Sequence, residues 1–166
     1  NSGAVYDVAE HAALNGKRVI LNPAPAAAVP EHVWKWIDIV TPNEVEAEYY
    51  TGIPVCSGES AEEAAQWFHR RGVRHVIITM GDSGAYLSVN GAGQMVPPFC
   101  VTAVDTTGAG DAFNGGLLAA LSEGKDLTQA VVFASAAAAL SVGRIGTAPS
   151  MPEREEILSL LKTVRK

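Results

Sequence analysis

Apolar residues recur along the chain with two alternating spacings, one typical of strands and one typical of helices. Short, nearly continuous apolar runs of the strand type occupy residues 18–22, 37–41, 74–79 and 99–104. Longer stretches with helical spacing occupy residues 5–15, 31–36, 43–51, 60–71, 110–122 and 127–142, and a last helix begins near residue 150. Strands that alternate with helices predict an α/β fold whose mostly parallel sheet has helices on both faces.

Capping and turn residues set the ends of several of these elements. Ser60, with Glu63 three residues later, predicts a capping box, and Ser150 is expected to cap the last helix. Val5 and Val8 are expected on the apolar face of the first helix. Asn90-Gly91 between two short runs is a strong hairpin signal, so we expect an antiparallel margin on the sheet.

Composition narrows the class of protein. The 166 residues are 48% hydrophobic and 18% charged, which is a globular composition with enough chain for one domain. A net charge of −6, with no cluster of Lys and Arg, argues against a nucleic-acid partner. The uncharged, Ala-rich run with helical spacing, 127–143, is shorter than the ~20 residues of a membrane-spanning helix.

Cysteine usage and the first residues bear on location. Cys56 and Cys100 are far apart and have no Cys-x-x-Cys partner, as expected of free thiols in a reducing compartment. No signal peptide is recognisable at the start. We therefore expect a cytoplasmic protein with no membrane partner.

The segment Val104–Gly116 carries the strongest chemical signal. It leads from an apolar run through small residues into a helix, which leaves free N–H groups at the positive end of the helix dipole, a ready site for phosphate. Asp111 lies in the first turn of this helix, where it either complements the dipole or takes a proton from a group that attacks the phosphorus. Phe113 disfavours a dinucleotide-binding fingerprint, and the Lys-Ser/Thr pair of a Walker A loop is absent.

Two other loops follow strands in the same manner. Residues 41–43, 79–81 and 106–108 all leave strand ends, so we expect them to converge on one ligand. Asn43 and Glu46 lie one helical turn apart, which suits either a water-bridged Mg²⁺ or a simple helix cap with an acidic first turn.

The run Asp-Thr-Thr-Gly-Ala-Gly-Asp-Ala-Phe-Asn-Gly-Gly at 105–116 resembles the C-terminal signature of the ribokinase-like (PfkB-type) carbohydrate kinases. The resemblance implies a three-layer αβα sandwich, incomplete at its N-terminal side. It also implies that Asp111 is the catalytic base and that the amides of Gly108, Ala109 and Gly110 form an anion hole.

The resemblance extends to cofactor sites. It implies that Asn43 and Glu46 act on Mg²⁺ and phosphate, Glu46 through water, and that Ser135 lies near the adenine of ATP. The implied nucleotide-binding residues, besides Gly110, are Thr79, Gly81, Asp82, Ser83 and Gly84. The implied site for an activating monovalent cation, K⁺, includes Asp105, Thr107, Ser141, Arg144, Gly146 and Ser150.

Within the family, residues 21–25, 41–44 and 104–152 are similar to the ribokinase branch more than to fructokinases or nucleoside kinases. This implies transfer of the γ-phosphate of ATP to a sugar hydroxymethyl group, with D-ribose the expected sugar. The alternatives are 2-keto-3-deoxygluconate, fructose or a nucleoside.

The match covers only the C-terminal half of a family member. We therefore expect residues 1–166 to be a single α/β domain that lacks the sugar-binding and lid part. The chain alone is then inactive, or is a nucleotide-binding module without catalysis. The intact protein is expected to form a homodimer.

Overall fold

The structure is a computed structural model that describes residues 2–163. The chain divides into two compact units, Asn1–Met80 with Tyr86–Met95, and Gly81–Ala85 with Val96–Lys166. The first unit contains the sheet except for Ala85 and Val96, and the second contains a bundle of helices.

The sheet of the first unit is mixed and has the strand order β1-β2-β3-β4-β5. Its strands are β1 (Ile20–Leu21), β2 (Ile39–Val40), β3 (His75–Thr79), β4 (Ala85–Val89) and β5 (Ala92–Val96). The first three are parallel, with Ile20 opposite Ile39 and Ile39 opposite His75. β4 and β5 are joined by Asn90-Gly91, both with positive φ (51° and 85°), as the predicted hairpin requires.

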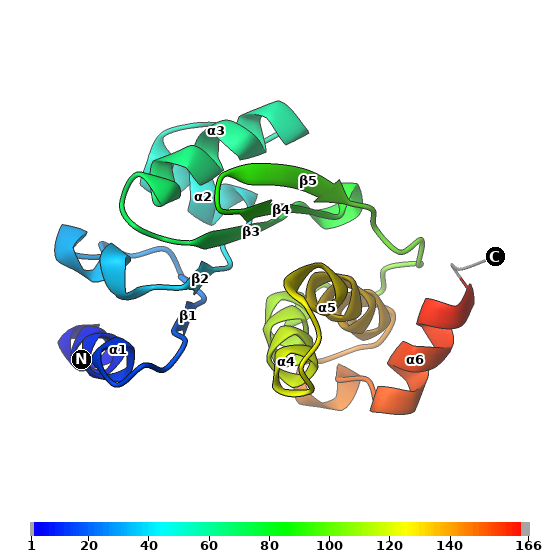
Figure 1. The fold of residues 1–166 in the computed structure, drawn as a ribbon. Coiled ribbons are helices and arrows are strands. Elements are labelled where there is room, and N and C mark those ends of the chain that lie inside the picture. The colour runs from blue at the N-terminus through cyan, green and yellow to red at the C-terminus, as the bar shows by residue number, and fades with distance from the viewer. Residues whose placement is uncertain (1, 164–166) are drawn as a thin grey trace. The chain divides into compact units, whose positions relative to one another are not determined.

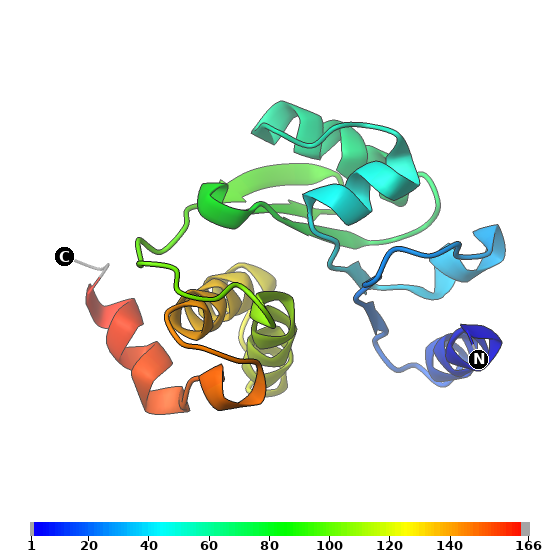
Figure 2. The ribbon, with the colours of Figure 1, turned by 180° about the vertical axis from the view of Figure 1, so that it is seen from behind.

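Four helical segments share one apolar core with these strands. They are α1 (Ser2–Leu14), the 3-10 helix η1 (Glu31–Trp36), α2 (Glu44–Thr51) and α3 (Gly58–His69). Figure 1 shows α2 and α3 on one side of strands β3 to β5, and Figure 2 shows the same layers from behind. Trp34 lies in this core, with its ring edge-on to those of Tyr50 and Phe68 at centroid distances of 5.3 and 5.4 Å.

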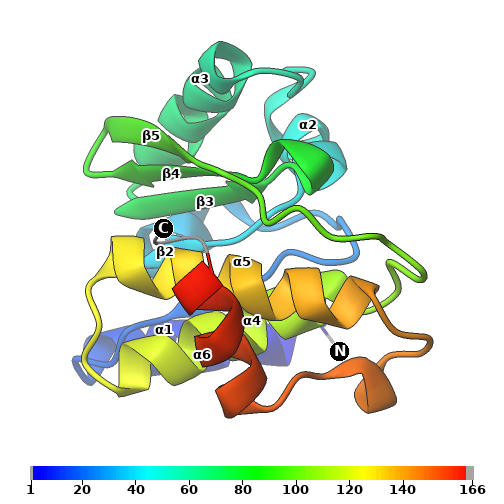
Figure 3. The same cartoon turned by 90° about the vertical axis from the view of Figure 1, so that its right-hand side faces the viewer.

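The second unit is built on a pair of helices, α4 (Ala109–Ser122) and α5 (Leu127–Val142), with α6 (Arg154–Thr163) lying against α5 (Figure 3). Two short 3-10 turns, η2 (Gly81–Ser83) and η3 (Ala148–Ser150), complete it. The two long helices approach closely at Gly116, where an added Cβ would lie 3.0 Å from both Ala134 Cα and Ala137 Cβ. A glycine facing alanines therefore sets the spacing of the pair.

The run 99–104, predicted to be a strand, has no regular structure. Its last amide, that of Val104, donates to the Val142 carbonyl at the end of α5 (2.7 Å), and Val101 and Val104 are exposed. The apolar run therefore ends against a helix terminus instead of joining the sheet.

Three details of the helices also differ from the prediction. Val5 and Val8 are exposed, because α1 turns Tyr6 and Ala9 toward the core and the Tyr6 hydroxyl donates to Ala28 O (3.0 Å). α3 begins three residues early, with Ser57 as its N-cap and Ser60 as the partner in the capping box. Ser150 lies in η3, and the last helix begins only at Arg154.

Two further features concern the cysteines and the lengths of the helices. Cys56 and Cys100 are both free and exposed. Within residues 2–163, each helix is too short or too polar to cross a membrane.

Candidate functional site

The N-terminus of α4 presents unpaired amides. Gly108, its N-cap, has a left-handed φ of 80°, and the first intrahelical bond runs from the Ala112 amide to Gly108 O (2.9 Å). Among residues 2–163, no hydrogen-bond acceptor lies within reach of the N–H groups of Gly108, Gly110 and Asp111. The Ala109 amide differs, since it donates to Thr106 O (3.2 Å). Two of the three amides predicted for an anion hole, those of Gly108 and Gly110, are thus free. The backbone amide of Asp111 is a third free donor at the same turn.

The side chain of Asp111 is exposed in the first turn of α4. Its carboxylate makes no hydrogen bond or ion pair with any other residue in the described part of the chain. A Cβ added at the neighbouring Gly110 would meet nothing within 4 Å, so the space beside the turn is open. A free carboxylate therefore lies beside free amides and the positive end of a helix dipole, an arrangement that can hold phosphate and accept a proton.

Asp105 connects the turn before α4 to a distant part of the chain. One carboxylate oxygen accepts from the Thr107 amide and the other from the Gly146 amide, each at 2.9 Å. The bond from Gly146, followed by those from Thr107, holds the pKa of Asp105 below its ordinary value. The carboxylate therefore stays ionised and pins residues 105–108 to the segment after α5.

The segment 141–150 is held mainly by local hydrogen bonds. The Ser141 hydroxyl donates to Ala138 O (2.8 Å) and the Ser150 hydroxyl to Thr147 O (2.6 Å), and both serines are buried. Their hydroxyl oxygens keep free lone pairs, so these oxygens can act as ligands of a hard monovalent cation. Arg144 offers only its backbone carbonyl for such a role, because a guanidinium is a cation without an acceptor atom. This guanidinium pairs instead with Glu156.

Sequence reasoning missed one contact at this turn. A Cβ added at Gly108 would lie 3.2 Å from the Thr147 side chain, so Thr147 closes over the N-cap. Glycine is therefore required at position 108 both by its backbone conformation and by this close approach.

In the first unit, Asn43 and Glu46 form a complete capping box at the start of α2. The Asn43 side chain accepts from the Glu46 amide (2.8 Å), and Glu46 Oε2 accepts from the Asn43 amide (2.9 Å). Asn43 also forms a parallel bridge with Thr79, and the Thr79 amide donates to Pro42 O (3.0 Å). The loops that follow β2 and β3 are thus adjacent, as the strand order predicted.

The remaining predicted nucleotide residues lie in the second unit. Asp82 and Ser83 are exposed on η2, between Gly81 and Gly84. Gly84 has a φ of 92°, and an added Cβ would fall 2.2 Å from Val96 O, so this turn is fixed against the following strand end. Ser135 is half-buried in the middle of α5.

The structure therefore groups the predicted residues in two places. Asn43, Glu46 and Thr79 lie together in the first unit, whereas the α4 turn, the segment 141–150 and η2 belong to the second. Within residues 2–163, His, Cys, Asp and Glu side chains nowhere gather in a group of three that could hold a metal ion. A Mg²⁺ site here would need to use one carboxylate, water and phosphate oxygens, as is common for this ion.

Comparison with known proteins gives these features a context. Residues 2–154 match the model of the pfkB family carbohydrate kinases. The chain belongs to this family. Its match therefore spans both groups of predicted site residues.

Relatives and solved structures agree with the family assignment. The chain is 46% identical over 154 residues to a ribokinase of Haemophilus influenzae, covering 93% of this chain and 50% of that protein. It is similar to the structure of Arabidopsis thaliana ribokinase complexed with ribose and ATP (TM-score 0.89, 36% identity), covering 95% of this chain and 51% of that one.

A Thermotoga maritima ribokinase structure gives a TM-score of 0.84 at 42% identity, covering 92% of this chain and 52% of that one. These matches confirm the predicted ribokinase-like α/β fold. The chain spans about half the length of the relatives it matches.

Proposed function

We propose that this chain is the nucleotide-binding half of an ATP-dependent sugar kinase that phosphorylates a hydroxymethyl group, with D-ribose the first substrate to test. The observation that carries the proposal is the exposed, unpaired carboxylate of Asp111 beside the free amides of Gly108 and Gly110. The pfkB family assignment and the ribokinases among the relatives support the same reaction class.

In this proposal Asp111 accepts the proton of the sugar hydroxyl as that oxygen attacks the γ-phosphorus of ATP. The bond from this phosphorus to the bridging oxygen breaks, and ADP leaves. The N–H groups at the start of α4 donate hydrogen bonds to the transferred phosphoryl group as its charge develops. The Ala109 amide joins them if it gives up its weak bond to Thr106 O. Water is replaced by amides that are already oriented, so little reorganisation is needed.

Asn43 and Glu46 are proposed to hold Mg²⁺ through water near the phosphates. Bound Mg²⁺ would neutralise phosphate charge. Glu46 Oε2 is committed to the Asn43 amide, so Oε1 is the oxygen available for a coordinated water. Thr79, beside Asn43, offers a hydroxyl to the same phosphates.

Asp105 and the oxygens of the segment 141–150 are proposed to hold a monovalent cation, K⁺. The donor set fits, since it consists of one ionised carboxylate with hydroxyl and carbonyl oxygens. Such a cation would add positive potential behind the amides of α4.

The experiment is a coupled assay of ADP release with ribose and ATP in the whole protein that carries this chain. Asp111→Asn should reduce kcat by about 10²- to 10⁴-fold and leave ATP binding intact, because the amide cannot accept the proton. Asp126→Asn is the matched control: Asp126 caps α5 through the Gln129 amide (2.8 Å), and Asn retains that cap. A normal rate for Asp111→Asn would contradict the proposal.

The identity of the sugar needs a separate comparison. A deoxyribokinase of Salmonella typhimurium is 37% identical to this chain and a maize fructokinase is 36% identical. We expect kcat/KM to be highest for D-ribose among ribose, deoxyribose and fructose. A higher value for either of the others would replace ribose while leaving the reaction class in place.

A further inference from the structure

Glu156 joins two parts of the second unit through its two carboxylate oxygens. Oε2 accepts a hydrogen bond from the Glu153 amide (2.8 Å), which caps α6. Oε1 accepts from Arg144 Nη2 and forms an ion pair with that guanidinium. Neither role was expected from the sequence, since Ser150 was the predicted cap of this helix and twelve residues separate the charged partners.

Arg144 stands at the start of the loop that reaches the α4 turn. Two residues later the Gly146 amide donates to Asp105 Oδ2 (2.9 Å), and the next residue, Thr147, closes over Gly108. An unbroken series of contacts therefore runs from the first turn of α6 to the N-cap of α4.

We propose that Glu156 is a positioning residue that acts through Arg144: it holds the loop 143–150 against Asp105 and Gly108, and so fixes the amides at the start of α4. The structural part of this inference stands without any reaction, whereas its catalytic consequence rests on the proposed function. Glu156 itself touches no substrate.

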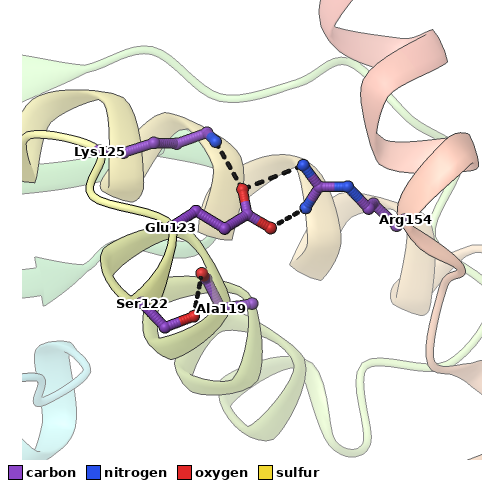
Figure 4. Close-up of polar contacts among 5 residues, drawn as sticks. All are labelled: Ala119, Ser122, Glu123, Lys125 and Arg154. Carbon is purple, nitrogen blue, oxygen red and sulfur yellow. Dashed lines mark hydrogen bonds and ion pairs between the residues drawn. The ribbon is translucent and has the colours of Figure 1, made fainter.

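α6 also carries a second ion pair that serves as an internal comparison. Arg154 pairs with Glu123, at the opposite end of α4, with Nη2 to Oε2 at 3.0 Å, and Lys125 Nζ lies 2.7 Å from the same carboxylate (Figure 4). This ion pair also attaches α6 to the rest of the second unit, but it takes no part in the contacts that lead from Glu156 to Gly146. Breaking it tests whether loss of any α6 ion pair is enough to loosen the loop.

The first measurement is hydrogen–deuterium exchange of the peptide covering residues 143–150, in the whole protein without nucleotide. Glu156→Gln keeps the capping role, since Gln serves at this position of a capping box, but removes the charge that Arg144 binds. We expect the Gly146 amide to exchange roughly two- to fivefold faster, as suits the loss of one half-buried ion pair.

Two control variants test whether the change in exchange is specific to Glu156. Glu155→Gln removes a neighbouring exposed carboxylate for which residues 2–163 supply no ion-pair or hydrogen-bond partner, and Arg154→Gln removes the other ion pair of α6. Both should leave exchange at Gly146 unchanged. Unchanged exchange in Glu156→Gln would overturn the inference, and so would an equal increase in Arg154→Gln, because the effect would then be general loosening of α6.

Steady-state kinetics then test the catalytic consequence. Glu156→Gln should lower kcat by about the same factor as the exchange rate rises, with KM for the sugar unchanged, because the amides act on the transferred phosphoryl group. Faster exchange without a change in kcat would support the positioning role and count against the proposed anion hole. The two measurements thus separate a failure of this inference from a failure of the proposed function.

Discussion

The carboxylate of Asp105 accepts a hydrogen bond from the amide of Gly146 at 2.9 Å, across 41 residues of sequence. The same carboxylate holds the Thr107 amide, so one side chain joins the turn before α4 to the loop after α5. An ionised acceptor makes stronger hydrogen bonds than a neutral one, and these bonds in turn keep the pKa of Asp105 low. The geometry of the α4 turn therefore depends on a contact that neither segment makes alone.

A substitution at Gly108 tests how closely Thr147 packs against the N-cap of α4. Gly108→Ala should lower the free energy of unfolding by about 1–2 kcal/mol for the left-handed backbone, with an added cost from the Thr147 side chain 3.2 Å away. Gly124→Ala is the control, since it has the same φ of 80° but open space around its Cβ. Urea unfolding of the two variants isolates the contact. Equal losses would show that Thr147 moves aside freely.

Gly115 and Gly116 give an opposed pair of predictions in the middle of α4. A Cβ at Gly115 meets nothing within 4 Å, so Gly115→Ala should stabilise the protein by about 0.5–1 kcal/mol through helix propensity. A Cβ at Gly116 lies 3.0 Å from α5, so Gly116→Ala should cost about 1–3 kcal/mol. Thermal unfolding decides the matter, and the same sign for both variants would contradict the observed helix spacing.

A substitution at Glu46 distinguishes its role in capping α2 from its proposed role near Mg²⁺. Glu46→Gln retains an acceptor for the Asn43 amide, so the free energy of unfolding should change little. The Mg²⁺ concentration required for half-maximal activity should rise about 10- to 100-fold, since the variant loses the charge proposed to hold a coordinated water. Titration of Mg²⁺ in the kinase assay measures this. An unchanged requirement would leave Glu46 with the cap alone.

His75 predicts a pH dependence of stability. Its Nδ1 is buried, and residues 2–163 provide no hydrogen-bond partner for it. Burial lowers the pKa of His75 below 6.5; Asp38 opposes this shift, whereas His69, Arg74 and Arg18 reinforce it. Because the unfolded chain then binds the proton more readily, stability should fall as the pH drops below about 6.5 and level off below the folded pKa.

Unfolding by urea from pH 5 to 8 would measure this loss. His75→Gln should remove the part of the slope that His75 supplies, whereas His32→Gln, at an exposed position on η1, should retain it. A slope that survives in His75→Gln would assign the effect to another group.

Elements with their own local signals were predictable from the sequence. α5 was predicted with its observed bounds, Leu127–Val142, from its apolar helical spacing alone; the structure adds Asp126 as its N-cap. The run 99–104 has an equally clear apolar pattern but failed as a strand, since the partner of the Val104 amide is the end of α5 and no local pattern encodes that.

The candidate site divides in the same way. The adjacency of Asn43 and Thr79 followed from two parallel strands ending at one edge of the sheet. The pairing of residue 105 with the segment after α5 came from family resemblance, and the Arg144–Glu156 ion pair was missed altogether. Contacts between loops depend on how the elements pack, so neither spacing nor composition reveals them.

The contact surface between α4 and α5 at Gly116 consists of glycine and alanine, which have no side-chain torsions to adjust. Movement of one helix along the other cannot be absorbed by rotamer changes and must shift whole backbones. The position of the amides at the start of α4 is therefore set by contacts between two backbones. A larger residue at Gly116 would displace the beginning of α4, seven residues away from the substitution.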